Sequence, residues 1–356
     1  MRVFVAGATG VIGQRLVPRL VAAGHQVVAT TRSPAKADSL RALGAEPAVV
    51  DGLDAMAVGE AVGRAGPEVV IHQMTQLAGM ANLRRFDRVF EVTNRLRTQG
   101  TDHLLAAATA AGARRFIAQG YAGWPSNRAG GPVQTEADPL DADPPAAQRQ
   151  SLGALRQLEA AVTGASSLDG IVLRYGSFYG PGASEEIFGL VRKRKLPIAG
   201  DGGGIWSFIH VDDAAAATVA ALDHGSRGVY NIVDDEPAKV ADWLPYLADV
   251  LGARPPVHIP VWLARLAAGE VGVSVLTQIR GSSNAKAKAE LGWTPAWASW
   301  RQGFRQAAAA MAAPRRAGGG SAPDRSACAG SGSAGSGSAG SGSGGSGSTG
   351  SGSATR

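Results

Sequence analysis

Short apolar runs of strand length alternate with longer segments of helical spacing along most of this 356-residue chain. The first apolar run covers residues 3–6, and apolar residues at helical spacing lead from it to a second run at residues 25–30. Further runs occur at residues 46–50, 69–72, 115–119, 170–174 and 229–233. Apolar strands separated by amphipathic helices are typical of a parallel sheet covered on both faces. We therefore predict an α/β fold with a doubly wound parallel sheet of the Rossmann type.

A glycine-rich turn joins the first predicted strand to the first predicted helix. Gly7 allows a sharp turn, Gly10 lets the backbone approach a pyrophosphate, and Gly13 lets the helix pack closely on the strand. The free N–H groups of the new helix then face an anion. The alternative is a turn that only packs helix against sheet. The order of strand, turn, helix and strand favours dinucleotide binding, by Gly7, Thr9, Gly10, Val11, Ile12 and Gly13.

The GxxGxxG spacing of this turn resembles that of the extended and atypical short-chain dehydrogenase/reductases, known as the NAD-dependent epimerase/dehydratase family. Residues 173–182 are similar to the family's LRxxxxYGPG stretch, and residues 284–293 resemble its usual ending. The resemblance covers about residues 1–312. It implies a Rossmann domain over residues 1–180 and a smaller α/β substrate lobe over residues 181–312, with the strand at 229–233 returning to the main sheet.

The end of the second strand predicts which dinucleotide binds. No acidic residue stands there to accept hydrogen bonds from a ribose 2′-hydroxyl, and Arg32 and Lys36 follow instead. A guanidinium suits a 2′-phosphate, which a carboxylate would repel. NADP is therefore expected in preference to NAD, unless Arg32 only faces solvent.

The resemblance places more of the chain against the cofactor. In the family, an aspartate at the place of Asp51 contacts the adenine edge, although Asp51 could instead cap the following helix. Small residues usually lie against the cofactor after the fourth strand, where this chain has the larger Gln73 and Met74. The other residues expected beside the cofactor are Gly52, Tyr175, Gly176 and Ser177.

The proton-transfer residues of the family are missing. Its members carry a Ser or Thr just past the fifth strand and a Tyr-x-x-x-Lys pair on the next helix, where the lysine lowers the tyrosine pKa. Gly120 or Tyr121 occupies the first place in this chain. When Glu159 is matched to the family's glutamate, Ser151 and Leu155 stand at the tyrosine and lysine positions.

Aromatic residues are the remaining candidates for the substrate pocket. A phenol at the carboxyl end of a parallel strand lies where ligands bind, so Tyr121 is the candidate catalytic residue. The alternative is that Tyr121 only lines the pocket with Trp124. In sugar-nucleotide enzymes an arginine that holds the diphosphate stands where this chain has Trp206, which favours a flatter or more apolar substrate. The expected substrate pocket comprises Gly120, Trp124, Ser151, Tyr179 and Trp206.

Composition narrows the choice of partners. Four arginines and one aspartate after Pro314 carry half of the formal charge of +6, so the folded part has no strongly basic character and no nucleic-acid partner is expected. No apolar stretch is long enough to cross a membrane, and the N-terminus reads as a strand, so we expect a cytoplasmic protein. Residues 313–356 are mostly Gly, Ser and Ala and predict a disordered tail, in which Cys328 lies.

These observations favour an NAD(P)-dependent oxidoreductase, or an epimerase/dehydratase-like enzyme, that acts on a small organic substrate with altered catalytic residues. No His, Cys or carboxylate cluster has metal-site spacing. The alternative is a catalytically inactive NADP-binding sensor or partner-binding protein, and a third reading is a structural role with vestigial cofactor affinity. The helix expected at residues 88–111 resembles the family's dimerisation helix, which makes a homodimer an expectation.

Overall fold

The structure is a computed structural model that describes residues 1–76 and 83–312. Its centre is a seven-stranded parallel sheet with the strand order β12-β7-β5-β4-β1-β2-β3. The strands are β1 (Arg2–Ala6), β2 (Gln26–Thr31), β3 (Glu46–Val49), β4 (Val69–His72), β5 (Arg115–Tyr121), β7 (Asp169–Tyr175) and β12 (Gly228–Ile232). The predicted Rossmann-type sheet is therefore confirmed, and β1 lies at the point where the strand order reverses.

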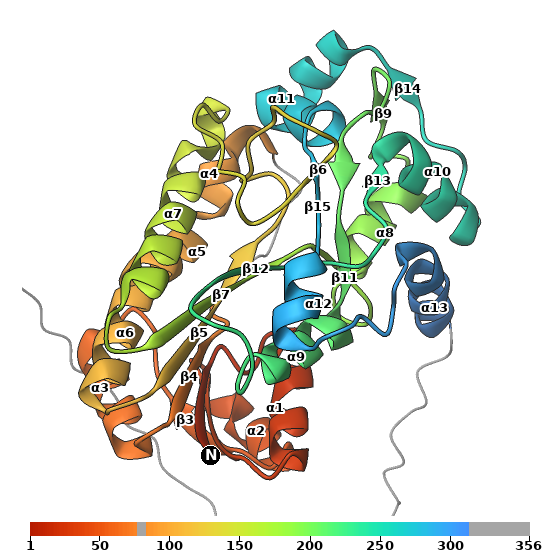
Figure 1. The fold of residues 1–356 in the computed structure, drawn as a ribbon. Coiled ribbons are helices and arrows are strands. Elements are labelled where there is room, and N and C mark those ends of the chain that lie inside the picture. Colours follow the sequence, from red (N-terminus) through yellow and green to blue (C-terminus); the bar gives the residue numbers. More distant parts are fainter. Residues whose placement is uncertain (77–82, 313–356) are drawn as a thin grey trace, which may run out of the picture. The chain divides into compact units, whose positions relative to one another are not determined.

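Helices cover both faces of this sheet (Figure 1). One face carries α3 (Ala55–Ala65), α6 (Thr101–Ala110) and α7 (Arg149–Gly164), and the other carries α1 (Gly13–Ala22), α2 (Ala37–Ala42) and α9 (Val211–Ala220). The alternation within β1 explains the two layers. Val3 and Val5 join the core beneath α1 and α9, whereas Phe4 and Ala6 join the core beneath α3 and α6.

The helix expected at residues 88–111 is divided into shorter pieces. It comprises α4 (Phe86–Val89), α5 (Glu91–Arg95), the π-helical turn η3 (Leu96–Gly100) and α6. Short 3₁₀ turns lie elsewhere in the first half of the chain, at η1 (Pro34–Lys36), η2 (Leu83–Arg85) and η4 (Ala146–Gln148). A π-helical turn holds an extra residue within a helix, and such turns are frequent at functional sites.

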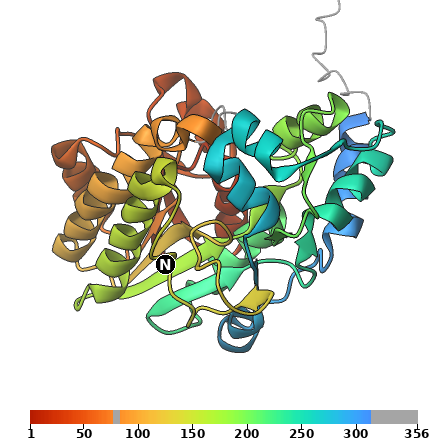
Figure 2. The same cartoon turned by 90° about the horizontal axis from the view of Figure 1, so that it is seen from above.

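A smaller lobe follows β7, beyond the carboxyl ends of the sheet strands (Figures 1 and 2). Its core is aromatic, with Trp243, Trp300, Phe208 and Phe304 buried together. The helices are α8 (Glu185–Arg192), α10 (Val240–Val250), α11 (Val261–Thr277), α12 (Ala285–Leu291) and α13 (Trp300–Ala312). The short strands pair as β8 (Ser177–Tyr179) with β11 (Phe208–His210), β9 (Ile198–Ala199) with β14 (His258–Ile259), and β10 (Ile205–Trp206) with β13 (Ala238–Lys239).

β12 pairs with β7, so the strand expected at residues 229–233 does return to the main sheet. A domain boundary at residue 180 stays a prediction, since β12 lies beyond that boundary. The predicted disordered tail and Cys328 lie outside the described residues. Within residues 1–76 and 83–312, no helix is long and apolar enough to cross a membrane.

The long loop between β5 and α7 is fastened to the smaller lobe. Its short strand β6 (Val133–Gln134) pairs with β15 (Gly281–Ser282). Arg280, the residue before β15, donates to the carbonyl of Ala129 at 2.9 Å and to the carboxylate of Asp138 at 3.0 Å. Loop residues and C-terminal residues therefore form one wall beyond the strand ends.

Candidate active site

The turn after β1 contains two glycines that the fold requires, Gly7 and Gly13, and one, Gly10, that has free space beside it. Gly7 has φ +88°, and a Cβ there would lie 2.6 Å from the main-chain carbon of Gln73. A Cβ on Gly13 would overlap the carbonyl of Ala8. Gly10, by contrast, has a single neighbour within 4 Å, its own turn's Gly7 oxygen at 3.3 Å. The backbone at Gly10 is therefore open to close approach.

The start of α1 offers donors beside this opening. The amides of Val11 and Ile12 have no hydrogen-bond acceptor among the described residues, and Ile12 caps the helix without a side-chain bond. Thr9 lies in the same turn and uses its carbonyl to accept from the Gln14 side chain at 3.2 Å. Free amides at the positive end of a ten-residue helix match the oxygens of a diphosphate, so the turn fits the dinucleotide expected from the sequence.

The end of β2 leaves its cations in solvent. Arg32 is exposed and donates to the Gln76 side chain at 3.3 Å, and Lys36 is exposed in η1. Neither cation forms an ion pair within the described residues. Both are therefore available to an anionic group beside β2.

The next strand end holds the residues expected near an adenine ring. Asp51 is exposed and accepts from the Leu53 amide at 3.0 Å, whereas α3 is capped by Asp54. The alternative role of Asp51 as the cap of α3 is therefore wrong. A Cβ on Gly52 would overlap the Met74 sulfur, so Met74 packs directly on that glycine.

Gln73 and Tyr175 form a buried polar bridge behind this edge. The Gln73 amide donates to the Tyr175 hydroxyl at 3.1 Å, and that hydroxyl also pairs with Thr218 at 2.6 Å. Burial raises the pKa of Tyr175 to about 12. A Cβ on Gly176 would lie 2.7 Å from the Ser207 carbonyl, so this glycine is required by close packing between β7 and β11. Tyr175 thus supports the strand ends from inside.

Tyr121 ends β5 at a small aromatic cavity. Its hydroxyl lies 3.1 Å from Ser177 Oγ, and its ring centroid lies 6.1 Å from that of Trp124. Trp206 closes another side and donates its indole N–H to the Val275 carbonyl at 2.9 Å. The structure therefore brings together four residues expected in the site, at a cavity lined by Tyr121, Trp124, Ser177, Trp206, Ser207 and Val275.

Three other expected pocket residues are occupied elsewhere. Ser151 is fully buried, and its hydroxyl donates to Asp87 at 2.6 Å and accepts from Asn94 at 3.0 Å. Tyr179 is buried in the aromatic core of the smaller lobe, with its ring 5.5 Å from that of Phe304. Gly120 is enclosed by its sheet neighbours and lines neither cavity.

Arg97 is a polar residue near this site that the sequence analysis did not single out. It lies in η3 with 3% of its surface exposed, and its Nε and Nη1 atoms are buried without a partner among the described residues. The preceding carbonyl, Leu96 O, lies 3.2 Å from Nε2 of His72 at the end of β4. Burial lowers the pKa of Arg97 to about 10, which leaves it cationic at neutral pH.

The titratable groups near Arg97 are neutral near pH 7. Burial lowers the pKa of His72 to about 4, so its ring is neutral near pH 7. Burial raises the pKa of the Tyr121 phenol, while its hydrogen bond with Ser177 and the nearby Arg97 cation oppose that rise. Tyr121 is therefore a neutral hydrogen-bond donor, and the strand ends β4 and β5 face one unpaired cation.

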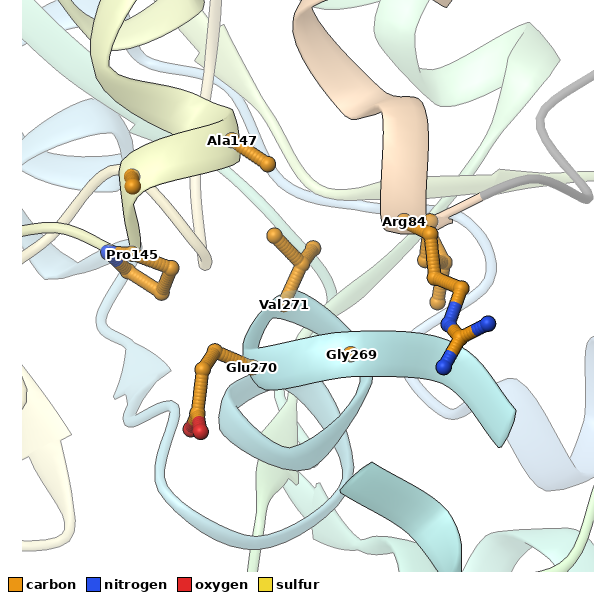
Figure 3. A pocket seen from close by; sticks show the side chains of 8 residues that line it. Arg84, Pro145, Ala147, Gly269, Glu270 and Val271 are labelled. Atoms are coloured by element: carbon orange, nitrogen blue, oxygen red, sulfur yellow. The ribbon is translucent and has the colours of Figure 1, made fainter. Parts of the chain in front are cut away.

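A larger cavity of about 300 Å³ lies between η2, η4 and α11. Figure 3 shows it between Pro145 and Ala147 on one side and Arg84 on the other, with the α11 kink at Gly269 alongside. Phe86 is buried beside this cavity, and its ring packs edge-on to that of Trp124 at 5.0 Å. The two cavities share no lining residue.

His210 has a structural position. It caps α9, with its Nδ1 accepting from the Asp212 amide at 3.1 Å, and its ring stacks 4.9 Å from that of Trp297. Asp212 pairs with Arg19 at 3.0 Å. Across the described part of the chain, no group of His, Cys, Asp and Glu could hold a metal ion.

Comparison with known proteins agrees with this geometry. The model of the NAD dependent epimerase/dehydratase family matches residues 3–233, which include the glycine turn and the strand ends just described. The chain belongs to this family. It is an NAD(P)-dependent oxidoreductase-like enzyme.

Two curated relatives of this family member are reductases. The 3-diazoavenalumate denitrifying reductase of a Streptomyces species is 46% identical over 315 residues, which cover 85% of this chain and 99% of the relative. The 2-alkyl-3-oxoalkanoate reductase of Stenotrophomonas maltophilia is 29% identical over 269 residues, covering 71% of this chain and 76% of the relative.

Solved structures share the fold. The UDP-glucose 4-epimerase of Thermotoga maritima, solved with UDP-glucose, has a TM-score of 0.69 at 22% identity and covers 87% of this chain and 98% of its own. The UDP-glucose 4-epimerase of Thermus thermophilus, solved with NAD, has a TM-score of 0.66 at 24% identity over 87% and 98%. At these identities the match shows a shared fold.

Proposed function

We propose that this protein is an NADPH-dependent reductase of a flat aromatic diazo compound, which it converts with loss of N₂. The observation that carries the proposal is the replacement of the family's proton-transfer pair on α7. Ser151 there is bound to Asp87, and Leu155 is buried. A reduction that needs no proton relay suits such a site, and the relative at 46% identity is named for a diazo substrate and for denitrification.

The chemistry balances without an acid or a base. A nicotinamide dinucleotide held at the turn after β1 would supply a hydride. At an aromatic diazonium carbon the hydride would replace N₂, so that a C–H bond forms, the C–N bond breaks, and its electron pair leaves on N₂. The protein has to bind and orient an aromatic ring and to exclude water. Tyr121, Trp124 and Trp206 supply aromatic walls for that purpose.

The choice of NADPH over NADH rests on the exposed cations after β2. Arg32 and Lys36 are available to a 2′-phosphate, and a guanidinium binds phosphate through charge-assisted hydrogen bonds. No carboxylate stands at the end of β2 to accept from a free 2′-hydroxyl. The cytoplasmic location and the homodimer expected from the sequence stay predictions.

The test uses an aromatic diazonium carboxylate and NADPH deuterated at the nicotinamide C4. We expect protein-dependent release of N₂, measured by mass spectrometry, and deuterium at the ring carbon that carried nitrogen. A protein-free reaction at the same NADPH concentration is the control, because diazonium salts are easily reduced. Equal N₂ release with and without protein, or an unlabelled product, would contradict the proposal.

A second candidate function is reduction of a ketone, and the geometry of Tyr121 favours it. The phenol is half-buried at the strand end, 3.1 Å from Ser177, and it could donate a proton to a developing alkoxide. The relative from Stenotrophomonas maltophilia is named as an oxoalkanoate reductase. Tyr121→Phe should lower ketone reduction by about 100-fold and leave N₂ release within about threefold.

A further inference from the structure

Arg97 has an unusual environment for a buried cation. Nε and Nη1 are sealed from solvent and lack a partner in residues 1–76 and 83–312, and no carboxylate of this part lies within ion-pair distance. Its main-chain carbonyl accepts from Thr101 at 2.7 Å, which holds the backbone while the guanidinium stays unengaged. Buried charges are normally paired, because an unpaired one costs several kcal/mol of desolvation.

Other buried arginines of this protein follow that rule. Arg174 makes two bonds to Glu159, at 2.6 and 2.7 Å. Arg115 donates to the carbonyls of Ala221 and His224 at 2.8 and 2.9 Å. Arg174 and Arg115 therefore have protein acceptors for their guanidinium groups, although Arg115 Nε has none, whereas no side-chain hydrogen bond of Arg97 is found within the described residues.

Arg97 lies near His72 and Tyr121 at the ends of β4 and β5, although it lines neither of the two cavities. η3 is tied to the end of β4 through the contact between Leu96 and His72, and β4 and β5 are adjacent strands. The titratable groups that face Arg97 are His72, neutral near pH 7, and the Tyr121 phenol. The diphosphate-binding amides of Val11 and Ile12 lie at the end of β1, on the far side of β4 from β5.

We propose that Arg97 binds an anionic oxygen of the substrate, a phenolate or a carboxylate conjugated to the aromatic ring that Tyr121 and Trp124 contact. This inference rests on the proposed function for the site and narrows its substrate class to flat aromatic anions. A guanidinium in a site of low dielectric binds such an oxygen through charge-assisted hydrogen bonds. A neutral ester or ether offers no charge to offset the desolvation of Arg97.

The test measures binding of unreactive probes, so that it does not depend on turnover. Cinnamate is compared with cinnamamide, and 4-nitrophenolate with 4-nitroanisole, by calorimetry at about pH 8 in the presence of NADP⁺. We expect the preferred anion to bind about 30-fold more tightly than its neutral partner, as a charge-assisted bond implies. The two pairs distinguish a carboxylate from a phenolate.

Two variants assign the effect to Arg97. Arg97→Met should abolish the preference for the anion, whereas Arg97→Lys should keep part of it. Without ligand, Arg97→Met should have an unchanged or higher Tm, because an unpaired buried charge is removed. If the wild-type protein prefers the anion and Arg97→Met does not, the inference is supported even if no N₂ is released.

Three results would overturn the inference. Equal binding of anions and neutral partners by the wild-type protein removes the anion site. An Arg97→Met variant with a strongly lowered Tm and unchanged anion preference assigns the residue to the fold. A variant that loses NADP⁺ affinity while it keeps the anion preference assigns the residue to the cofactor.

Discussion

Arg174 and Arg97 are both buried near the carboxyl ends of sheet strands, yet their surroundings are opposite. Arg174 extends from β7 to the α7 carboxylate of Glu159, and both oxygens of that carboxylate accept from it. Arg97 lies in η3 with two sealed nitrogens and no protein acceptor in the described part of the chain. A charge satisfied inside the protein supports the fold, whereas one left open indicates a ligand.

The same contrast runs through the rest of the molecule. Ser151 is engaged by Asp87 and Asn94, and Arg280 is engaged by the loop before α7. The backbone at Gly10, in contrast, has unfilled space beside it. The carboxyl group of Asp234 has one buried oxygen without a hydrogen-bond partner among the described residues. Changes at satisfied groups should therefore cost stability, and changes at open groups should alter binding or pH dependence.

The largest effect is expected from breaking the satisfied arginine pair. Glu159→Gln leaves the Arg174 cation buried without its counter-charge and should lower the free energy of unfolding by about 3 kcal/mol or more. Chemical denaturation measures this loss. Glu60→Gln, at an exposed position of α3, is the matched control and should change stability by less than about 0.5 kcal/mol. Equal effects would remove the contrast between satisfied and open charges.

Asp234 should make stability fall as pH rises. Burial raises the pKa of its carboxyl to about 8, while the unfolded chain releases that proton near the ordinary aspartate value of 3.8. Between these values the folded state holds a proton that the unfolded state has lost, so the stability contribution is greatest at low pH. Asp234→Asn should remove a slope of up to about 1.4 kcal/mol per pH unit, measured by denaturation between pH 5 and 7. An unchanged slope would contradict this.

Gly10 and Gly13 separate binding from folding within one turn. Gly10→Ala should weaken dinucleotide binding by about tenfold, or about 1.4 kcal/mol, with little change in Tm because the added Cβ meets only Gly7 O at 3.3 Å. Gly13→Ala is the paired variant, and its Cβ overlaps Ala8, so its Tm should fall. Calorimetry and thermal denaturation of both variants show whether the two effects divide this way.

The smallest effect is expected at the exposed end of β2. Arg32→Ala should reduce NADPH affinity by about fivefold, close to 1 kcal/mol, because an exposed charge is screened by solvent. NADH affinity should change by less than about twofold. Titration of both dinucleotides measures the ratio, and equal losses would leave the preference for NADP without support.

The strands of the main sheet and the glycine turn after β1 could be predicted from the sequence. The GxxGxxG spacing places three glycines between β1 and α1, and two of them fill positions where a Cβ cannot fit. The apolar runs correspond to the strands of the main sheet because strands buried on both faces need continuous apolar sequence. The absence of a Tyr-x-x-x-Lys pair was equally readable from the residues.

The side chains that meet from different elements could not be predicted as readily. Tyr121, Ser177 and Trp206 come from separate strands, and only the fold brings them to one cavity. Arg97 was missed because a cation inside a helix is usually exposed. In the structure Thr93 and Thr101, four residues to either side of Arg97 on the same helical face, are both fully buried. A charge on the buried face of a helix indicates a site worth testing.

The π-helical turn at Leu96–Gly100 carries Arg97, and with the anion site proposed for that residue it offers a simple way to change what the protein binds. A wide turn contains one residue more than a regular one, and each residue advances a helix by about 100°. Deletion of a single residue within it would return the helix to regular winding and rotate Arg97 relative to α6. Substrate range in such a scaffold can therefore shift through an insertion or a deletion of one codon, with every residue of the sheet left in place.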